Sequence, residues 1–248
     1  MKKFITALHI IYSNFTMFFI FYPWTAINTI IVLIGAMLGI KPVVKFFLYL
    51  WANGMFWFVG RKINVTGREN IEKGKQYLIV LNHTSMFDFP AVMAVFPRVA
   101  WLGREVLLNI PVFGRMLEAT DYIAIYPGDT EKSKQSINTA IERSGRISIA
   151  IFPEGTRTLD GEMKDFKKGF TYIIRGTDLD VLPVTLNGLF KWKQKFQWYL
   201  TPLEKVVLVV HEKISNESLR QMSNEEMSVY IKKIIESGLL PQRRDDEK

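Results

Sequence analysis

Hydrophobic positions divide the chain into two parts with different patterns. Up to residue 60 they form three long apolar runs, at residues 4–22, 26–40 and 46–60. Beyond them, short apolar runs alternate with stretches of helical spacing, which is typical of an α/β fold. We therefore predict an α/β domain over residues 61–248, with a mixed sheet flanked by helices. A membrane-associated pair of helices over residues 1–60 would precede it.

Seven runs in the second part have the length and apolar character of buried strands. They cover residues 63–66, 77–81, 99–102, 122–126, 147–152, 181–186 and 206–210. Between two of them, residues 131–144 carry apolar side chains at helical spacing and stop before Gly145, which predicts a helix. Near the end, Ser223 and Glu226 form a capping-box pattern that predicts the start of another helix.

The first part contains no acidic residue. Its charged side chains are Lys2, Lys3, Lys41 and Lys45. A secretory signal is a poor interpretation, because no small-residue cleavage site closes the first run and further apolar runs follow. A soluble core is also a poor interpretation, because clusters such as residues 17–22 would need a partner layer. Lysines beside apolar helices favour a membrane surface, with the lysines at the lipid headgroups.

Each apolar run is short for a membrane crossing, which needs roughly 20 apolar residues. The first run approaches that length, but four polar residues interrupt it: His9, Ser13, Asn14 and Thr16. Pro23 and Trp24 then predict a hairpin break with an interfacial aromatic ring. We interpret the flanking runs as two helices dipping into one leaflet. A two-span hairpin and a buried helical subdomain are the alternatives.

Composition limits the chemistry and the partners. The chain has 248 residues, a formal net charge of +8 and no cysteine. The absence of cysteine excludes disulfides, thiolate metal sites and a cysteine acyl-enzyme. The positive charge favours anionic partners, either nucleic acid, an acidic lipid surface or a phosphorylated substrate.

Of the three histidines, His83 alone has a suggestive neighbour. It follows the predicted strand 77–81, and Asp88 comes after four intervening residues. A neutral imidazole can accept a hydroxyl proton, and a carboxylate can orient the ring and stabilise the imidazolium. His9 and His211 lie in an apolar run and at the end of a strand, where a structural role is expected.

The sequence argues against a serine nucleophile and against a metal site beside this pair. The chain has no G-x-S-x-G elbow, so the alcohol of a substrate would replace the catalytic serine. No second histidine lies near His83 in the sequence, so no metal site is expected. We expect the hydroxyls of Thr84 and Ser85 to cap the helix that carries Asp88.

A second motif, FPEGTR at residues 152–157, follows the predicted strand 147–152. Gly155 lets backbone approach an anion closely, and Arg157 offers a planar fork for phosphate. Three lysines follow: Lys164, Lys167 and Lys168. A turn with a solvated arginine is the alternative, but so much positive charge near glycines favours a phosphate site. Together, the two motifs suggest acyl transfer to a phosphorylated alcohol.

One segment offers a competing partner. Residues 190–199, FKWKQKFQWY, interleave lysines with aromatic residues, as single-stranded nucleic acid sites do. The same mixture suits the headgroup layer of a bilayer. Because the N-terminal part is apolar, we prefer the membrane and expect no nucleic acid partner. A solvated amphipathic hairpin is the third possibility.

NHTSMFD and FPEGTR resemble the first and third sequence blocks of the glycerolipid acyltransferases, in particular the bacterial 1-acyl-glycerol-3-phosphate acyltransferases. VLPVTL at 181–186 is similar to the fourth block, and GREVLLNIPVFG at 103–114 to another family stretch. The resemblance covers about residues 62–211. It implies that His83 is the base and Asp88 its partner. The residues implied to bind the acceptor are Glu154, Gly155, Thr156, Arg157, Arg104 and Lys167.

One departure from the family pattern concerns the acceptor. The second block usually ends in an arginine after a strand, but the matching segment here, YIAIYP at 122–127, has none. Either Arg157 and a nearby base such as Arg104 or Lys167 hold the phosphate, or the acceptor headgroup differs. The departure therefore leaves the reaction type as expected and the acceptor open.

The resemblance implies esterification of lysophosphatidic acid by an acyl thioester, giving phosphatidic acid, with no cofactor. Acyl-coenzyme A and acyl carrier protein are equally suitable donors, since both are anionic. The alternatives are a same-fold enzyme acting on glycerol 3-phosphate or another lysolipid, and a non-catalytic membrane-surface adaptor. We expect the protein on a phospholipid surface at the cytoplasmic face of the cell membrane; the sequence predicts no oligomeric state.

Overall fold

A seven-stranded mixed sheet forms the centre of the molecule. The computed structural model describes residues 2–197 and 199–241. The strand order is β1-β7-β6-β2-β5-β3-β4, parallel throughout except for the antiparallel pair β6–β7. The strands are β1 (Ile63–Thr66), β2 (Tyr77–Leu81), β3 (Val99–Arg104), β4 (Ile123–Ile125), β5 (Ser148–Ile151), β6 (Asp180–Asn187) and β7 (Val206–Val210). All seven predicted strands are confirmed, each within two residues of its expected ends.

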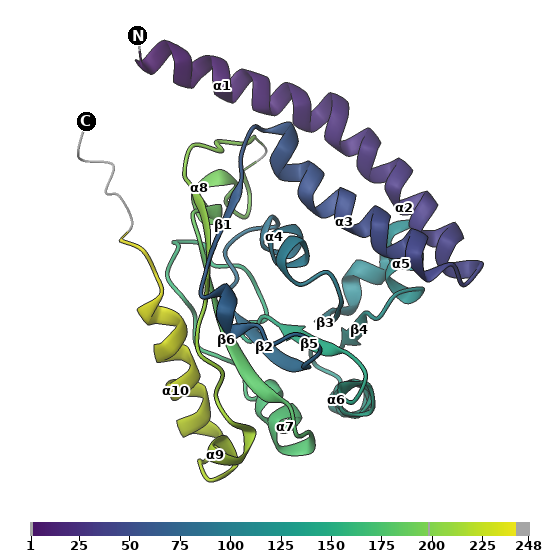
Figure 1. Ribbon diagram of the computed structural model, residues 1–248, viewed down its shortest axis with the longest axis vertical. Helices are drawn as coiled ribbons and strands as arrows, with labels where there is room; N and C mark the ends of the chain where they lie inside the picture. The colour runs from purple at the N-terminus through teal and green to yellow at the C-terminus, as the bar shows by residue number, and fades with distance from the viewer. Residues whose placement is uncertain (1, 198, 242–248) are drawn as a thin grey trace.

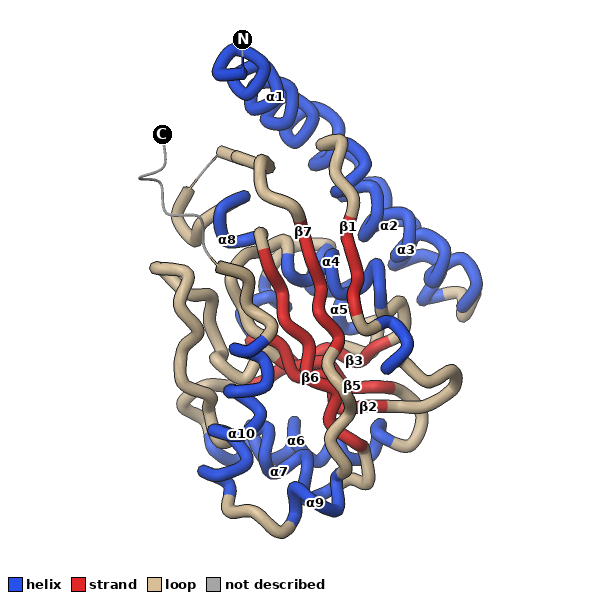
Figure 2. Tube along the Cα trace, turned by 60° about the vertical axis from the view of Figure 1, so that its left-hand side comes forward, coloured by secondary structure: helices blue, strands red, loops and turns tan. Residues whose placement is uncertain are grey.

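Helices cover both faces of this sheet (Figures 1 and 2). One face carries α2 (Tyr22–Met37), α3 (Lys41–Phe58), α4 (Asp88–Val95) and α5 (Phe113–Glu118). The other carries α6 (Thr130–Ser144), α7 (Gly169–Gly176), α9 (Asn216–Arg220) and α10 (Asn224–Ser237). The remaining helices are α1 (Lys2–Thr16), α8 (Leu189–Trp192), the π turn η1 (Met17–Phe21) and two 3-10 turns, η2 (Arg68–Asn70) and η3 (Glu105–Asn109). The predicted capping box is confirmed at Ser223 and Glu226 of α10.

Strand β2 shows how the alternation of side chains builds two cores. Tyr77, Ile79 and Leu81 belong to the cluster under α3 and α4. Leu78 and Val80 belong to the cluster under α6, α7 and α10. All five side chains are buried, as expected for a central strand with helices on both faces.

The predicted break at Pro23 is wrong. Residues Phe4–Met37 form one helix, long and apolar enough by length and composition to cross a membrane. Just before the proline, the N–H of Tyr22 donates to the carbonyl of Met17 in the π turn η1. This wider turn accommodates the proline, which has no N–H to donate and whose ring would otherwise clash with the preceding turn of an α-helix.

The chain instead reverses after α2. Gly39 has a φ of +70°, a left-handed conformation that suits glycine, and α3 then returns alongside α2. The helical pair is therefore made of residues 2–37 and 41–58, rather than of the two runs on either side of Pro23.

Polar residues in the first helix face the domain. Asn14 donates from Nδ2 to the carbonyl of Leu200 at 2.9 Å and accepts at Oδ1 from its N–H at 2.8 Å. Ser13 and Thr16 are buried beside it. Thus Asn14, which seemed to interrupt a membrane segment, attaches α1 to the segment that follows β6.

The opposite side of this helix is apolar and exposed. Its exposed large side chains are Phe4, Ile5, Leu8, Ile11, Tyr12, Phe15, Phe18, Phe19, Ile20 and Tyr22. In contrast, Met17, Phe21 and Val32 are buried in the same cluster as strand residues of the sheet. The N-terminal helices therefore share a core with the domain on one side and leave an apolar surface on the other. The division of the chain at residue 60 stays a prediction.

Candidate active site

The predicted site residues lie where parallel strands end at one edge of the sheet. His83 follows β2, the FPEGTR motif follows β5, and Arg104 ends β3. Asn82 attaches this edge to β6: its Nδ2 donates to the carbonyl of Leu186 at 3.0 Å, and its Oδ1 accepts from the N–H of Leu186 at 2.7 Å. The carboxyl end of such a sheet is the usual place for a ligand site.

His83 and Asp88 form the expected pair. The distance from Nδ1 of His83 to Oδ2 of Asp88 is 2.9 Å. An ionised carboxylate can only accept, so Nδ1 donates and Nε2 keeps a free lone pair. The His83 side chain is 21% exposed, whereas that of Asp88 is fully buried. The ring can therefore meet a substrate while its partner stays out of water.

The Asp88 carboxylate is held by the turn that precedes it. Its Oδ2 accepts from the N–H groups of Thr84 at 2.6 Å and Ser85 at 2.8 Å, and Oδ1 accepts from the Thr84 hydroxyl at 3.2 Å. The expectation that the Thr84 and Ser85 hydroxyls cap α4 is wrong. They lie in a turn around the carboxylate, and the Ser85 hydroxyl donates to the carbonyl of Lys193 at 3.0 Å.

Glu154 fixes the backbone of both motifs. Its Oε1 accepts from the N–H of His83 at 2.7 Å, and its Oε2 accepts from the N–H of Lys164 at 2.9 Å. The side chain is 3% exposed, and this burial raises the pKa of Glu154 above its usual range. The N–H of Thr158 also donates to the carbonyl of His83 at 3.0 Å. Glu154 therefore fixes the backbone of the two motifs, with one hydrogen bond from a backbone N–H to each carboxylate oxygen.

The remaining predicted contacts surround this loop. Gly155 has a φ of +69°, and the aliphatic part of Lys167 packs over the space where a Cβ would lie. Thr156 accepts at its hydroxyl from Nζ of Lys195 at 3.1 Å. Arg157 is half-buried, and its carbonyl accepts from Nζ of Lys164 at 3.3 Å. The loop thus presents Arg157 among several lysines.

Arg104 is less closely tied to the group. It is exposed at the end of β3, and its carbonyl accepts from the Tyr122 hydroxyl at 2.9 Å. Among the described residues its guanidinium makes no hydrogen bond or ion pair. The structure thus places Arg104 at the correct edge of the sheet but does not join its side chain to Arg157.

A stack of aromatic rings lies behind His83, which sequence reasoning missed. The imidazole stacks on Phe152 at 4.1 Å between ring centroids, and Phe152 stacks on Trp101 at 5.5 Å. Trp101 in turn stacks on Phe89 at 3.9 Å. The stack restricts the plane of the imidazole by contact with one ring face. Phe152 is the first residue of FPEGTR and follows a buried strand, and this position could have indicated that its ring lies beside His83.

The lysines that follow β6 were expected at the lipid headgroups, and their position beside the two motifs was not foreseen. Lys193 contacts Ser85 and Lys195 contacts Thr156, while Trp192 is fully buried against Phe87 and Phe56. Phe196 is exposed, and position 198 lies outside the described residues. The interleaved lysines and aromatics are thus divided between the core and the site edge.

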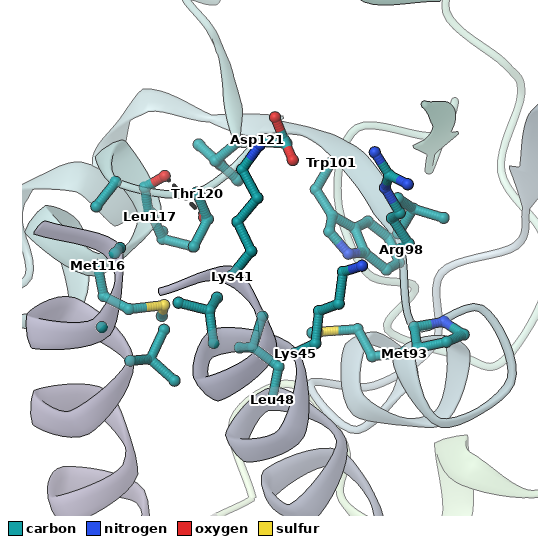
Figure 3. Close-up of a pocket in the computed structure, with 18 of the residues that line it drawn as sticks. Lys41, Lys45, Leu48, Met93, Arg98, Trp101, Met116, Leu117, Thr120 and Asp121 are labelled. Atoms are coloured by element: carbon teal, nitrogen blue, oxygen red, sulfur yellow. Dashed lines mark hydrogen bonds between the residues drawn. The ribbon is translucent and has the colours of Figure 1, made fainter. Parts of the chain in front are cut away.

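Beyond Trp101, a cavity of about 500 Å³ lies between the hairpin α2–α3 and the elements β3, α4 and α5 (Figure 3). Its apolar lining includes Leu48, Met93, Trp101, Met116 and Leu117. The lining also includes four charged residues, which Figure 3 labels: Lys41, Lys45, Arg98 and Asp121. Within the described residues no group of histidine and acidic side chains has a metal-ligating arrangement.

Comparison with known proteins agrees with this geometry. The acyltransferase family model matches residues 62–187. A 1-acyl-sn-glycerol-3-phosphate acyltransferase of Borreliella burgdorferi is 37% identical over 134 residues, covering 52% of this chain and 53% of the relative. The chloroplastic LPAT1 enzyme of Arabidopsis thaliana, with the same printed activity, is 26% identical over 195 residues, covering 77% and 53%. The chain spans about half the length of the curated relatives it matches.

A solved structure extends the likeness to the N-terminal helices. The 1-acyl-sn-glycerophosphate (LPA) acyltransferase PlsC of Thermotoga maritima has a TM-score of 0.75 and 25% sequence identity. The match covers 96% of this chain and 97% of that one.

The position of Glu154 leads to a first prediction. Glu154→Gln keeps the volume, but its amide turns one N–H donor toward a backbone N–H, so one of the two hydrogen bonds is lost. We expect the free energy of unfolding to fall by about 1–3 kcal/mol. Because His83 loses an anchor, we expect kcat to fall about tenfold to a hundredfold. Glu162→Gln, at an exposed position in the same loop, is the control. Equal denaturant midpoints and equal kcat for both variants would contradict this role.

Proposed function

The chain belongs to the acyltransferase family, and from this premise we propose that it acylates the free hydroxyl of lysophosphatidic acid, forming phosphatidic acid. The observation that carries the proposal is the His83–Asp88 pair, whose Nε2 has no hydrogen-bond partner among the described residues and which lies beside the basic Arg157 loop. The printed activities of the relatives support the same acceptor.

The reaction needs no covalent intermediate on the enzyme. In our proposal, Nε2 of His83 removes the proton from the acceptor hydroxyl as its oxygen attacks the thioester carbonyl. Asp88 stabilises the imidazolium through Nδ1. When the tetrahedral intermediate collapses, the carbon–sulfur bond breaks and His83 returns the proton to the leaving thiolate. One ester and one thiol result, and the histidine is neutral again.

Acyl-coenzyme A or acyl carrier protein would supply the thioester, and no cofactor is needed. The cavity beside Trp101 is a suitable compartment for the acyl chain, because its lining is largely apolar and it lies behind the aromatic stack of His83. Its volume of about 500 Å³ is within the usual range for ligand pockets. The acyl chain would enter this cavity by displacing the ring of Trp101 or Phe152.

We propose further that the exposed apolar side of residues 4–22 lies in one leaflet, on the cytoplasmic face of the cell membrane. The helix is long enough to cross, but Met17, Phe21 and Val32 are buried in the core of the domain. A helix attached to the domain along much of its length lies along the bilayer surface. The soluble donors are cytoplasmic, which favours that face.

A second prediction concerns the proposed base. His83→Ala should lower kcat by about a hundredfold to ten-thousandfold, with little change in acceptor binding, because a general base acts in the transition state. Purified variant and wild type would be assayed with lysophosphatidic acid, glycerol 3-phosphate and other lysolipids, with each donor. His211→Ala is the control, since His211 bonds to Thr185 of β6 away from the motifs.

Three results would count against the proposal. Near-wild-type turnover of the folded His83→Ala variant would exclude His83 as the general base. Preference of the wild type for glycerol 3-phosphate or another lysolipid would favour the same-fold alternative, and no transfer to any acceptor would favour the membrane-surface adaptor.

A third prediction concerns the exposed apolar side of the first helix. Ile11→Glu with Phe15→Glu places two charges on that side, where Ile11 is 66% and Phe15 is 56% exposed. Because charges at the acyl boundary are costly, we expect sedimentation with anionic vesicles to fall at least tenfold. Activity should fall on bilayer acceptor and persist on a short-chain soluble one. The control carries Val229→Glu and Tyr230→Glu on α10. Equal loss of vesicle binding in both variants would contradict the assignment.

A further inference from the structure

The site has more positive charge than the family motifs account for. The segment after β6 brings Lys193 and Lys195 to the loop that carries Arg157. Nζ of Lys195 donates to the Thr156 hydroxyl at 3.1 Å, one residue before Arg157. The backbone of Lys193 is held at the base of the site, because its carbonyl accepts from the buried Ser85 hydroxyl at 3.0 Å.

Ser85 connects this lysine segment to the catalytic pair. The same residue donates its N–H to the Asp88 carboxylate and its hydroxyl to Lys193. Its side chain is fully buried, so neither contact is exchanged easily for water. The position of the lysines is therefore coupled to the turn that holds Asp88.

The positive charges near Arg157 lack a protein counter-ion. Among the described residues, Arg157, Lys193 and Lys195 make no ion pair with a carboxylate. Nζ of Lys193 donates to the carbonyl of Gln197, an uncharged partner. Burial lowers the pKa of Lys193, and the charge of Arg157 lowers it further. Like charges held together in a half-buried edge are stabilised when an anion binds between them.

We propose that Lys193 and Lys195 complete the phosphate site of the acceptor and supply the positive charge that segment 122–127 lacks. This inference rests on the proposed function, from which it takes the identity of the acceptor. The ligand chemistry is a phosphomonoester, as carried by both lysophosphatidic acid and glycerol 3-phosphate. Arg157 offers a planar fork to two of its oxygens, while the two ammonium groups approach from the segment after β6.

The test compares Lys193→Gln, Lys195→Gln and the double variant with wild type. Lys205→Gln is the matched control, because Lys205 is an exposed lysine just before β7, at the same edge of the sheet. Loss of a charged hydrogen bond to phosphate should raise the acceptor KM about tenfold for each single variant, with kcat and the donor KM little changed. With an uncharged monoacylglycerol acceptor, all variants should match wild type.

A binding measurement separates this inference from the proposed reaction. Glycerol 3-phosphate and inorganic phosphate would be titrated into the full-length protein in detergent by calorimetry. The wild type and Lys205→Gln should bind both, and the double variant at least tenfold more weakly, whatever acceptor the enzyme uses. Thermal midpoints of all variants would show that each is folded.

Three results would overturn the inference. Equal phosphate affinity in the double variant and wild type would place the anion elsewhere. An increase in donor KM alone would assign the lysines to the phosphates of the donor. Equal loss of activity on phosphorylated and uncharged acceptors would mean that the lysines only maintain the shape of the loop.

Discussion

The buried carboxylate of Asp88 is the interaction on which the site depends. A charge without solvent is costly unless it is paired and hydrogen-bonded, and Asp88 is fully buried. Its partners are His83 and the turn formed by Thr84 and Ser85. Those bonds fix the tautomer of His83, determine the path of the chain into α4, and place the hydroxyl of Ser85 against Lys193. Thus one carboxylate orients the proposed base and positions the segment proposed to bind the substrate.

The parallel strands explain why residues far apart in sequence meet at this carboxylate. β2, β5, β3 and β6 all end at one edge, so the segments that follow them converge there. Glu154 joins the β2 and β5 segments through two backbone N–H groups, and Asn82 joins β2 to β6. The hairpin of α2 and α3 covers the same face of the sheet as α4. An edge built in this way brings His83, the Arg157 loop and the segment after β6 into one region, which the proposed reaction requires.

Much of this arrangement could be predicted because its signals are local. Short apolar runs predicted all seven strands, and the spacing of His83 and Asp88 predicted their contact, which the structure gives at 2.9 Å. The turn at Gly39 was missed because Pro23 is the stronger local signal for a break, whereas the π turn that accommodates it depends on packing. Lys193 and Lys195 were assigned to a lipid surface because their composition suits one. The contact of Lys195 with Thr156 and that of Lys193 with Ser85 depend on strand order, which no local pattern contains.

The central claim is that His83 meets a hydroxyl while the nearby cations hold a phosphate. The most direct test is an experimental structure of the wild-type protein with lysophosphatidic acid bound and no donor. Our account predicts that Nε2 of His83 lies within about 3.2 Å of the free hydroxyl oxygen. The phosphate should contact the guanidinium of Arg157. A bound acceptor whose hydroxyl points away from His83, or whose phosphate lies outside the Arg157 loop, would contradict the account.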